Sequence, residues 1–197
     1  MDAKKVYVDN VMPAQKVGSA VGMDKKQWFV AIVKNNTERK CSEQLRRLGY
    51  DTYVPVQQET RQWKNGRINT VPRVVIAAVV FLYISEQERR EVVNMPFIHK
   101  FMTNRAEPAD RYNRHPLVVI PDSQMKNFRF LLENTDSNVT IIDHIAAGKI
   151  VIVTSGVLKG LTGIVSDIDD ENSMVGIRID GLGYACVRIQ KNQITII

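Results

Sequence analysis

Residues 148–165, GKIVIVTSGVLKGLTGIV, constrain the fold of this chain more than any other segment. Successive side chains of a strand point to opposite faces, so the alternating Val151 and Val153 are predicted to face a core. Gly156, Gly160 and Gly163 follow closely, and glycine adopts positive φ at little cost. The segment therefore predicts two strands joined by a sharp turn.

Four further β-rich runs share the C-terminal part of the chain with this segment. Clusters of Gly, Asp and Asn separate the runs, and regular short strands of this kind are typical of a small barrel. The five strands are predicted over residues 150–154, 164–168, 174–179, 184–189 and 193–197.

The residues before this region indicate an α/β unit. Apolar, β-branched runs predict strands at 27–33, 50–56 and 74–84, and the last is apolar enough to be buried on both faces. A hairpin is predicted over 57–71, with Asn65 and Gly66 at its turn. Three helices are predicted. The first follows Asn36 and Thr37, which can serve as N-caps, and the second begins at the capping box Ser85–Glu88. The third begins at Pro121, and its apolar stripe consists of Met125, Phe128, Leu131 and Leu132.

The sequence divides into four parts. Residues 1–26 are predicted to be a flexible tail, 27–133 an α/β domain, 134–144 a linker and 145–197 the β-barrel. Residues 1–133 carry 22 Lys and Arg against 14 Asp and Glu, whereas residues 134–197 carry 5 against 7. This change of sign suggests two units with different partners.

Several classes of protein are disfavoured. No apolar run approaches the length of a membrane span, and the first 26 residues lack the apolar region of a secretory signal. Two distant cysteines make no disulfide framework, so a cytoplasmic protein is expected. His99, His115 and His144 have no ligands at metal-binding spacing, and no nucleophile or phosphate-loop motif is present. We therefore expect no enzyme activity, metal or cofactor.

The glycine-spaced segment resembles the KOW motif, V-x-V-x-x-G-x-x-x-G-x-x-G-x-V. The matching residues are Val151, Val153, Gly156, Gly160, Gly163 and Val165. Upstream, QWFVAIV, TYVPV, MPFIHKFM and HPLVVIPDSQM resemble, in order, segments of the NusG N-terminal (NGN) domain. The chain is thus similar to bacterial NusG-type transcription elongation factors. The resemblance implies an α+β fold: an NGN-type α/β sandwich with a four-stranded, mainly antiparallel sheet and about three helices, then a five-stranded KOW barrel.

One segment departs from the family pattern. Housekeeping NusG proteins have F-P-G-Y before the central strand, where this chain has Ile76-Ala77-Ala78-Val79. Together with the N-terminal tail, this departure is most similar to the specialised UpxY type, antiterminators of capsular polysaccharide operons.

The resemblance implies a docking surface for the clamp helices of the largest RNA polymerase subunit. The positions that match it are Trp28, Tyr53, Pro55, Ile76, Val79 and Phe81. Exposed apolar area marks interaction sites, but strand residues are usually core, and for Trp28 and Phe81 both interpretations stand. Ile76 and Val79 are assigned to docking by the resemblance alone.

The predicted hairpin is basic and carries a tryptophan. Arg61, Lys64, Arg67 and Arg73 could contact upstream or non-template DNA or nascent RNA, and Trp63 could stack on a base. A hairpin that is merely kept soluble by its charges is an equally good interpretation.

The resemblance implies a monomeric, cytoplasmic bacterial protein that promotes processive transcription of long operons. Its KOW domain would bind a ribosomal protein or the termination factor Rho. The alternatives are a housekeeping elongation factor and a ribosome-associated RNA-binding protein. Residues 150–197 are rich in β-branched residues and glycine, which disfavour helix. We therefore expect the barrel to be permanent and to leave the docking surface open.

Overall fold

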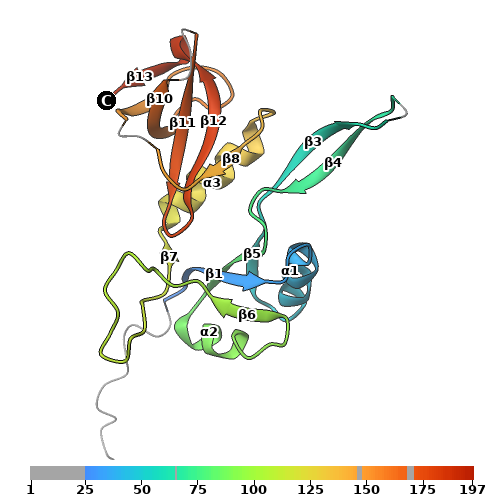
Figure 1. Ribbon diagram of the computed structural model, residues 1–197, viewed down its shortest axis with the longest axis vertical. Coiled ribbons are helices and arrows are strands. Elements are labelled where there is room, and N and C mark those ends of the chain that lie inside the picture. The colour runs from blue at the N-terminus through green and yellow to red at the C-terminus, as the bar shows by residue number, and fades with distance from the viewer. Residues whose placement is uncertain (1–24, 65, 146–147, 168–170) are drawn as a thin grey trace, which may run out of the picture.

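The computed structural model describes residues 25–64, 66–145, 148–167 and 171–197. The predicted tail thus lies outside the described residues, apart from Lys25 and Lys26. The described chain forms an α/β domain and an antiparallel β-domain, with a projecting hairpin (Figure 1). The predicted order of an α/β unit followed by an all-β unit is confirmed.

The sheet of the α/β domain is antiparallel. Its order is β2 (Asp51–Tyr53), β5 (Val79–Ile84), β1 (Gln27–Val33) and β6 (Ile98–Phe101), and β7 (Val119–Ile120) also pairs with β1. Side chains of β1 alternate between two cores: Phe29 packs on the side of α1 (Glu38–Arg47) and α2 (Glu86–Val92), whereas Val30 packs on the side of α3 (Asp122–Asn134). All of β5 except the half-buried Tyr83 is buried, which confirms a central strand covered on both faces.

The central strand begins later than the sequence predicts. Residues 75–78 form a bend, and Ala78 has a φ of 60°. The Ala78 amide donates to Glu38 Oε1 at 2.6 Å, and the Ala78 carbonyl accepts from Val33 N at 2.9 Å. Glu38 is buried, so its carboxylate fixes the bend from the start of α1.

Helix starts follow the sequence in one case and not in another. Ser85 caps α2 with a complete capping box, in which Glu88 is the partner, as predicted. The predicted side-chain cap of α1 is wrong, because Thr37 makes no capping hydrogen bond. Asn36 N instead donates to the Glu38 carboxylate at 3.2 Å.

The β-domain contains all five predicted strands and one more. The sheet order is β13 (Ile194–Ile196), β9 (Ile150–Val153), β10 (Thr162–Asp167), β11 (Asn172–Ile179), β12 (Gly183–Gln190) and β8 (Thr140–Ile142). The extra strand, β8, lies inside the segment predicted to be a linker and pairs with β12. We refer to residues 140–197 as the barrel domain.

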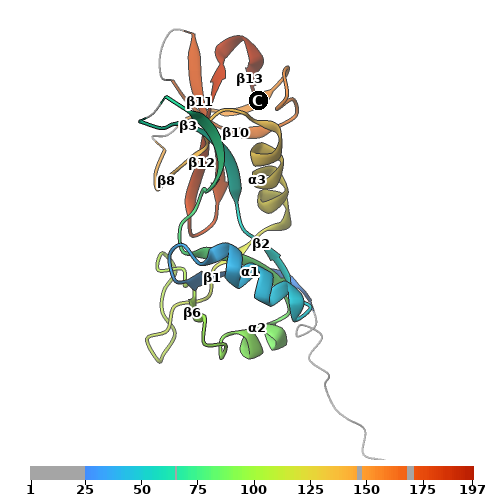
Figure 2. The same ribbon diagram turned by 90° about the vertical axis from the view of Figure 1, so that its right-hand side faces the viewer.

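Helix α3 lies between the two domains. It contacts β1 and β3 (Val56–Gln62) on one side and β11 of the barrel domain on the other (Figure 2). Its buried residues Met125, Phe128, Leu131 and Leu132 belong to a single apolar cluster that extends from the sheet into the barrel. At one end of α3, Asp180 N donates to Gln124 Oε1 at 2.9 Å. The β11–β12 turn also packs on Val118, because a Cβ added to Gly181 would lie 2.6 Å from Val118 Cγ2.

Candidate functional site

Most of the predicted docking residues lie on one face of the α/β sheet. Val79 and Phe81 project from β5 on the face that α3 covers, and Ile76 lies in the bend that precedes β5. Trp28 and Tyr53 pack against the same cluster from β1 and β2. We call Trp28, Tyr53, Ile76, Val79 and Phe81 the apolar patch. Pro55 is buried nearby, and its carbonyl accepts from Val75 N at 2.8 Å.

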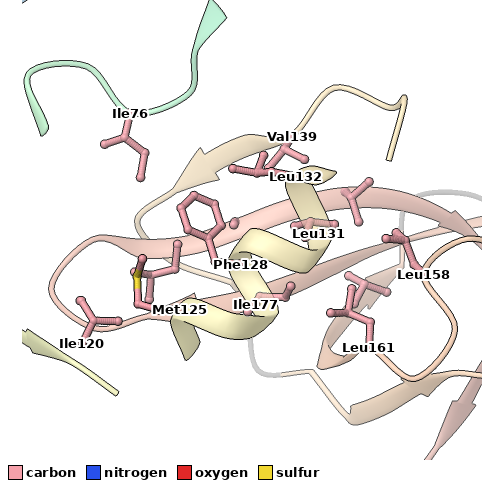
Figure 3. Packing of buried hydrophobic residues seen from close by; sticks show 14 of the residues in the cluster. Ile76, Ile120, Met125, Phe128, Leu131, Leu132, Val139, Leu158, Leu161 and Ile177 are labelled. Atoms are coloured by element: carbon pink, nitrogen blue, oxygen red, sulfur yellow. The ribbon is translucent and has the colours of Figure 1, made fainter. Parts of the chain in front are cut away.

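Helix α3 covers the apolar patch. The ring of Phe128 lies 6.2 Å from that of Phe81 and 6.4 Å from that of Tyr53, both edge-on, which is a favourable aromatic geometry. Figure 3 shows Ile76 facing the side of α3 that carries Phe128 and Leu132. Ile76, Val79 and Phe81 are no more than 9% exposed.

The expectation of an open docking surface is therefore wrong for this arrangement. The barrel packs on the far side of α3, so the patch, the helix and the barrel share one core. Burial raises the pKa of Tyr53 to about 12, against the opposing effect of Arg129, whose guanidinium lies 5.1 Å above the tyrosine ring.

Trp28 and Tyr53 are the members of the patch that solvent partly reaches. The Trp28 ring lies 5.1 Å from that of Tyr83, and Trp28 and Tyr83 line a hollow with Arg46, Thr52 and Arg129.

The predicted basic hairpin is present and projects into solvent. β3 pairs with β4 (Ile68–Val74) from Val56↔Val74 to Gln62↔Ile68. Asn65 lies outside the described residues, and Gly66 has a φ of 79°, as the turn prediction requires. Trp63 at the tip is 56% exposed. We call Arg61, Lys64 and Arg67 the tip cations, because all three are exposed near the end of the hairpin.

Arg73 lies nearer the base of the hairpin than the tip cations do. Its Nη2 donates to the Val139 carbonyl at 3.1 Å, and its Nε lies 3.8 Å from Glu59 Oε2. Arg73 therefore binds the segment between α3 and β8 in this structure. Among the tip cations, Arg61 is ion-paired, since its Nη2 lies 2.8 Å from the same Glu59 Oε2.

A buried glutamine at the hairpin base was not predicted from the sequence. Gln57 Nε2 donates to the Ser137 carbonyl at 2.6 Å, and Gln57 Oε1 accepts from Val139 N at 2.9 Å. The side chain is 5% exposed. Together with Arg73, Gln57 ties the hairpin to residues 135–139. We call the two hydrogen bonds of Gln57 to Ser137 and Val139 the glutamine clamp. Nothing in the local sequence marks Gln57 apart from the exposed Gln58.

The KOW residues lie within the barrel domain. Val151 and Val153 are buried, and Gly156 and Gly160 have φ values of 79° and 90° in the turn between β9 and β10. A Cβ on Gly163 would lie 2.8 Å from the Gly176 carbonyl, so the absence of a side chain lets β10 and β11 approach. In this structure these residues shape the barrel.

Other chemistry is sparse within the described ranges. These ranges hold no cluster of three His, Cys, Asp or Glu side chains suited to a metal ion, and no helix in them is long and apolar enough to cross a membrane. Cys41 and Cys186 are free and buried, and burial raises the pKa of the Cys186 thiol to about 11. A thiol with so high a pKa is a poor nucleophile.

Comparisons with known proteins agree with this architecture. Residues 26–129 match the family described as "NusG: Transcription termination factor nusG". The chain is 22% identical over 201 residues to the transcription termination/antitermination protein NusG of Rickettsia felis, with 95% of each chain covered. The structure described as "Domain interaction in Thermotoga maritima NusG" superposes with a TM-score of 0.50 at 16% identity, covering 88% of this chain and 98% of that one.

Proposed function

Because the chain belongs to the NusG family of transcription factors, we propose that it binds RNA polymerase through the apolar patch and promotes transcript elongation. The observation that carries this proposal is the gathering of Trp28, Tyr53, Val79 and Phe81 on one sheet face. Aromatic residues clustered around a central pocket dominate most binding energies. The clamp helices of the largest polymerase subunit are the proposed partner.

Binding through the patch requires α3 and the barrel to move. Ile76, Val79 and Phe81 have almost no exposed surface, so they cannot contact a partner until Phe128 and the rest of α3 move away from them. When only a fraction of molecules is open, the apparent Kd rises by the inverse of that fraction. The closed arrangement is therefore a built-in limit on polymerase affinity.

The tip cations and Trp63 supply a second contact. They project away from both domains, so the hairpin can reach upstream or non-template DNA or nascent RNA while the patch holds the polymerase. Cations near phosphates release counterions, and an exposed indole stacks on an unpaired base.

The specialised role remains a proposal drawn from the sequence. Ile76-Ala77-Ala78-Val79 in place of F-P-G-Y favours a UpxY-type antiterminator of long operons, such as capsular polysaccharide operons. The barrel domain would then bind a ribosomal protein or Rho. Transcript profiling after deletion separates the roles: loss of the distal genes of one long operon supports the specialist, and a genome-wide change supports a housekeeping factor.

The docking proposal is tested by binding of the full-length chain to purified core polymerase without nucleic acid. Trp28→Ala is expected to weaken binding about tenfold, because a rim tryptophan of a docking patch contributes at least ~1.4 kcal/mol. Trp63→Ala is the matched control and is expected to bind like the wild type, since its tryptophan sits at the hairpin tip. Equal affinities of the two variants, both folded by circular dichroism, would show that the patch is not the docking site.

A further inference from the structure

The longest irregular connection in the α/β domain joins β6 to β7. Residues 102–118, which we call the Arg–Tyr loop, form an excursion that lies far from the hairpin tip in both views (Figures 1 and 2). Its neck is a short antiparallel ladder, in which Val118 N donates to the Met102 carbonyl and Asn104 N to the Pro116 carbonyl, at 2.9 and 2.8 Å. Neither the apolar patch nor the basic hairpin uses any part of this loop.

The tip of the Arg–Tyr loop is held in one shape by Asp110. Its Oδ1 accepts from the backbone amides of Tyr112 and Arg114 at 2.8 and 2.9 Å, and its Oδ2 accepts from Arg114 Nε at 3.1 Å. These bonds hold the pKa of Asp110 below its usual range, the backbone amide of Arg114 contributing most. The negative charge of Asp110 is thus compensated within the turn. The hydrogen bonds also fix the backbone of residues 110–114, so little conformational entropy would be lost when this turn binds a ligand.

The turn carries an exposed aromatic ring, that of Tyr112, in contact with two guanidinium groups. Tyr112 is 62% exposed, and the Cζ atoms of Arg111 and Arg114 lie 4.8 and 4.9 Å from its ring centroid. Because most of its side chain is exposed, Tyr112 is not part of the apolar core. Guanidinium and phenol planes are both surfaces on which unpaired bases stack.

Arg114, which lies over the Tyr112 ring, also lines a hollow. Arg89, Arg105 and His115 line the same hollow, together with Asp110. Arg89 is paired with Glu86, but neither Arg105 nor Arg111 has an ion-pair partner in the part of the chain that the structure describes. Residues 99–117 carry four Lys and Arg against two acidic residues, so the surface attracts phosphate.

We propose that the Arg–Tyr loop is a second nucleic-acid site, which binds single-stranded DNA or RNA by stacking a base at Tyr112 and seating phosphates at Arg105 and Arg111. A duplex is disfavoured, because its bases are already stacked and cannot reach the ring. An incoming base displaces one guanidinium from Tyr112, and that guanidinium then pairs with the adjacent phosphate. The site is independent of polymerase docking and of the hairpin.

The test is fluorescence anisotropy of the full-length chain with labelled dT and rU 12-mers. It is done in a background in which the tip cations are changed to Glu, so that the hairpin does not contribute. Tyr112→Ala is expected to raise the Kd about tenfold, and Tyr112→Phe, which keeps the ring, to bind as the parent does. Arg111→Gln is expected to make the salt dependence shallower by about one phosphate contact. The control Arg47→Gln changes an exposed arginine on α1, remote from the loop, and leaves the salt dependence unchanged.

The outcomes separate clearly. Whichever of the dT and rU oligonucleotides binds more tightly shows whether the loop prefers DNA or RNA. Either preference supports the proposal if Tyr112→Ala weakens the binding. Affinity that does not change in Tyr112→Ala, or tighter binding of a polyglutamate peptide than of either oligonucleotide, would overturn it. Polymerase binding of the Tyr112 variants is expected to be unchanged, so this proposal and the docking proposal fail separately.

Discussion

Replacing Gln57 with leucine removes the glutamine clamp without leaving a large cavity. Leucine has nearly the volume of glutamine but cannot bind the Ser137 carbonyl or the Val139 amide, which Gln57 holds at 2.6 and 2.9 Å. The Val139 side chain is fully buried, so its amide has no ready access to water in the closed arrangement. Ser137 is exposed, so water can replace the bond to its carbonyl.

The size of the effect follows from these two groups. An orphaned buried amide costs about 1–3 kcal/mol, and a hydrogen bond exchanged for water about 1 kcal/mol. The closed arrangement should therefore lose about 2–4 kcal/mol relative to an open one in which residues 135–139 are hydrated, which is roughly a 30- to 700-fold shift. If closed molecules predominate in the wild type, polymerase affinity rises by up to the same factor.

Two measurements check this prediction. Hydrogen exchange of the Val139 amide, followed by NMR, should accelerate in Gln57→Leu, and the Kd for core polymerase should fall. Gln58→Leu is the matched control. Gln58 is the next residue on β3 and its side chain is exposed, so this change should leave both the exchange rate and the Kd unchanged. Faster Val139 exchange without tighter polymerase binding would show that the closed arrangement does not limit docking, which would refute the reasoning.

Three further predictions concern single contacts. Gly181→Ala should lower the Tm more than Gly160→Ala, because both have positive φ but only at Gly181 does the new methyl group collide with a buried valine, as scanning calorimetry can show. Ala78→Gly should raise the free energy of unfolding, measured in urea, by about 0.5–1 kcal/mol. The left-handed conformation costs alanine about 1–2 kcal/mol, and glycine removes this cost but makes the unfolded chain more flexible, which offsets part of the gain. A loss of stability would contradict this. Reversing the tip cations should make the salt dependence of hairpin–DNA contact in the elongation complex shallower, and an unchanged slope would mean that they only aid solubility.

Local patterns predicted the elements whose cause is local. The apolar run that contains β5, the capping box at Ser85 and the glycine spacing of the barrel all express backbone or burial preferences that act within a few residues. The strands and the two-part architecture followed from them. The hairpin was predicted too, since its turn has Gly66 at positive φ.

The bend before β5 could not be predicted in the same way. Residues 74–84 are uninterrupted by glycine, proline or charge, so the sequence gives no local reason for the strand to stop at 75–78. The cause is Glu38, whose carboxylate accepts the amide of Ala78 and so holds a left-handed conformation that alanine alone disfavours. An interaction across 40 residues leaves no mark in the segment that it shapes.

The apolar patch shows why core and docking surface are hard to separate by sequence. Both are made of the same side chains, and burial under Phe128 stabilises Phe81 by the same transfer of apolar area that burial under a partner would. What decides between them is whether the cover can leave. α3 and the barrel are attached to the sheet domain mainly by apolar contact, and the polar ties at Gln57 and Arg73 join these side chains to backbone atoms of residues 137 and 139. Water can replace such ties once the surfaces part, so opening exposes apolar area but strands no charge. A polymerase helix that buries the same area can therefore take the place of the cover.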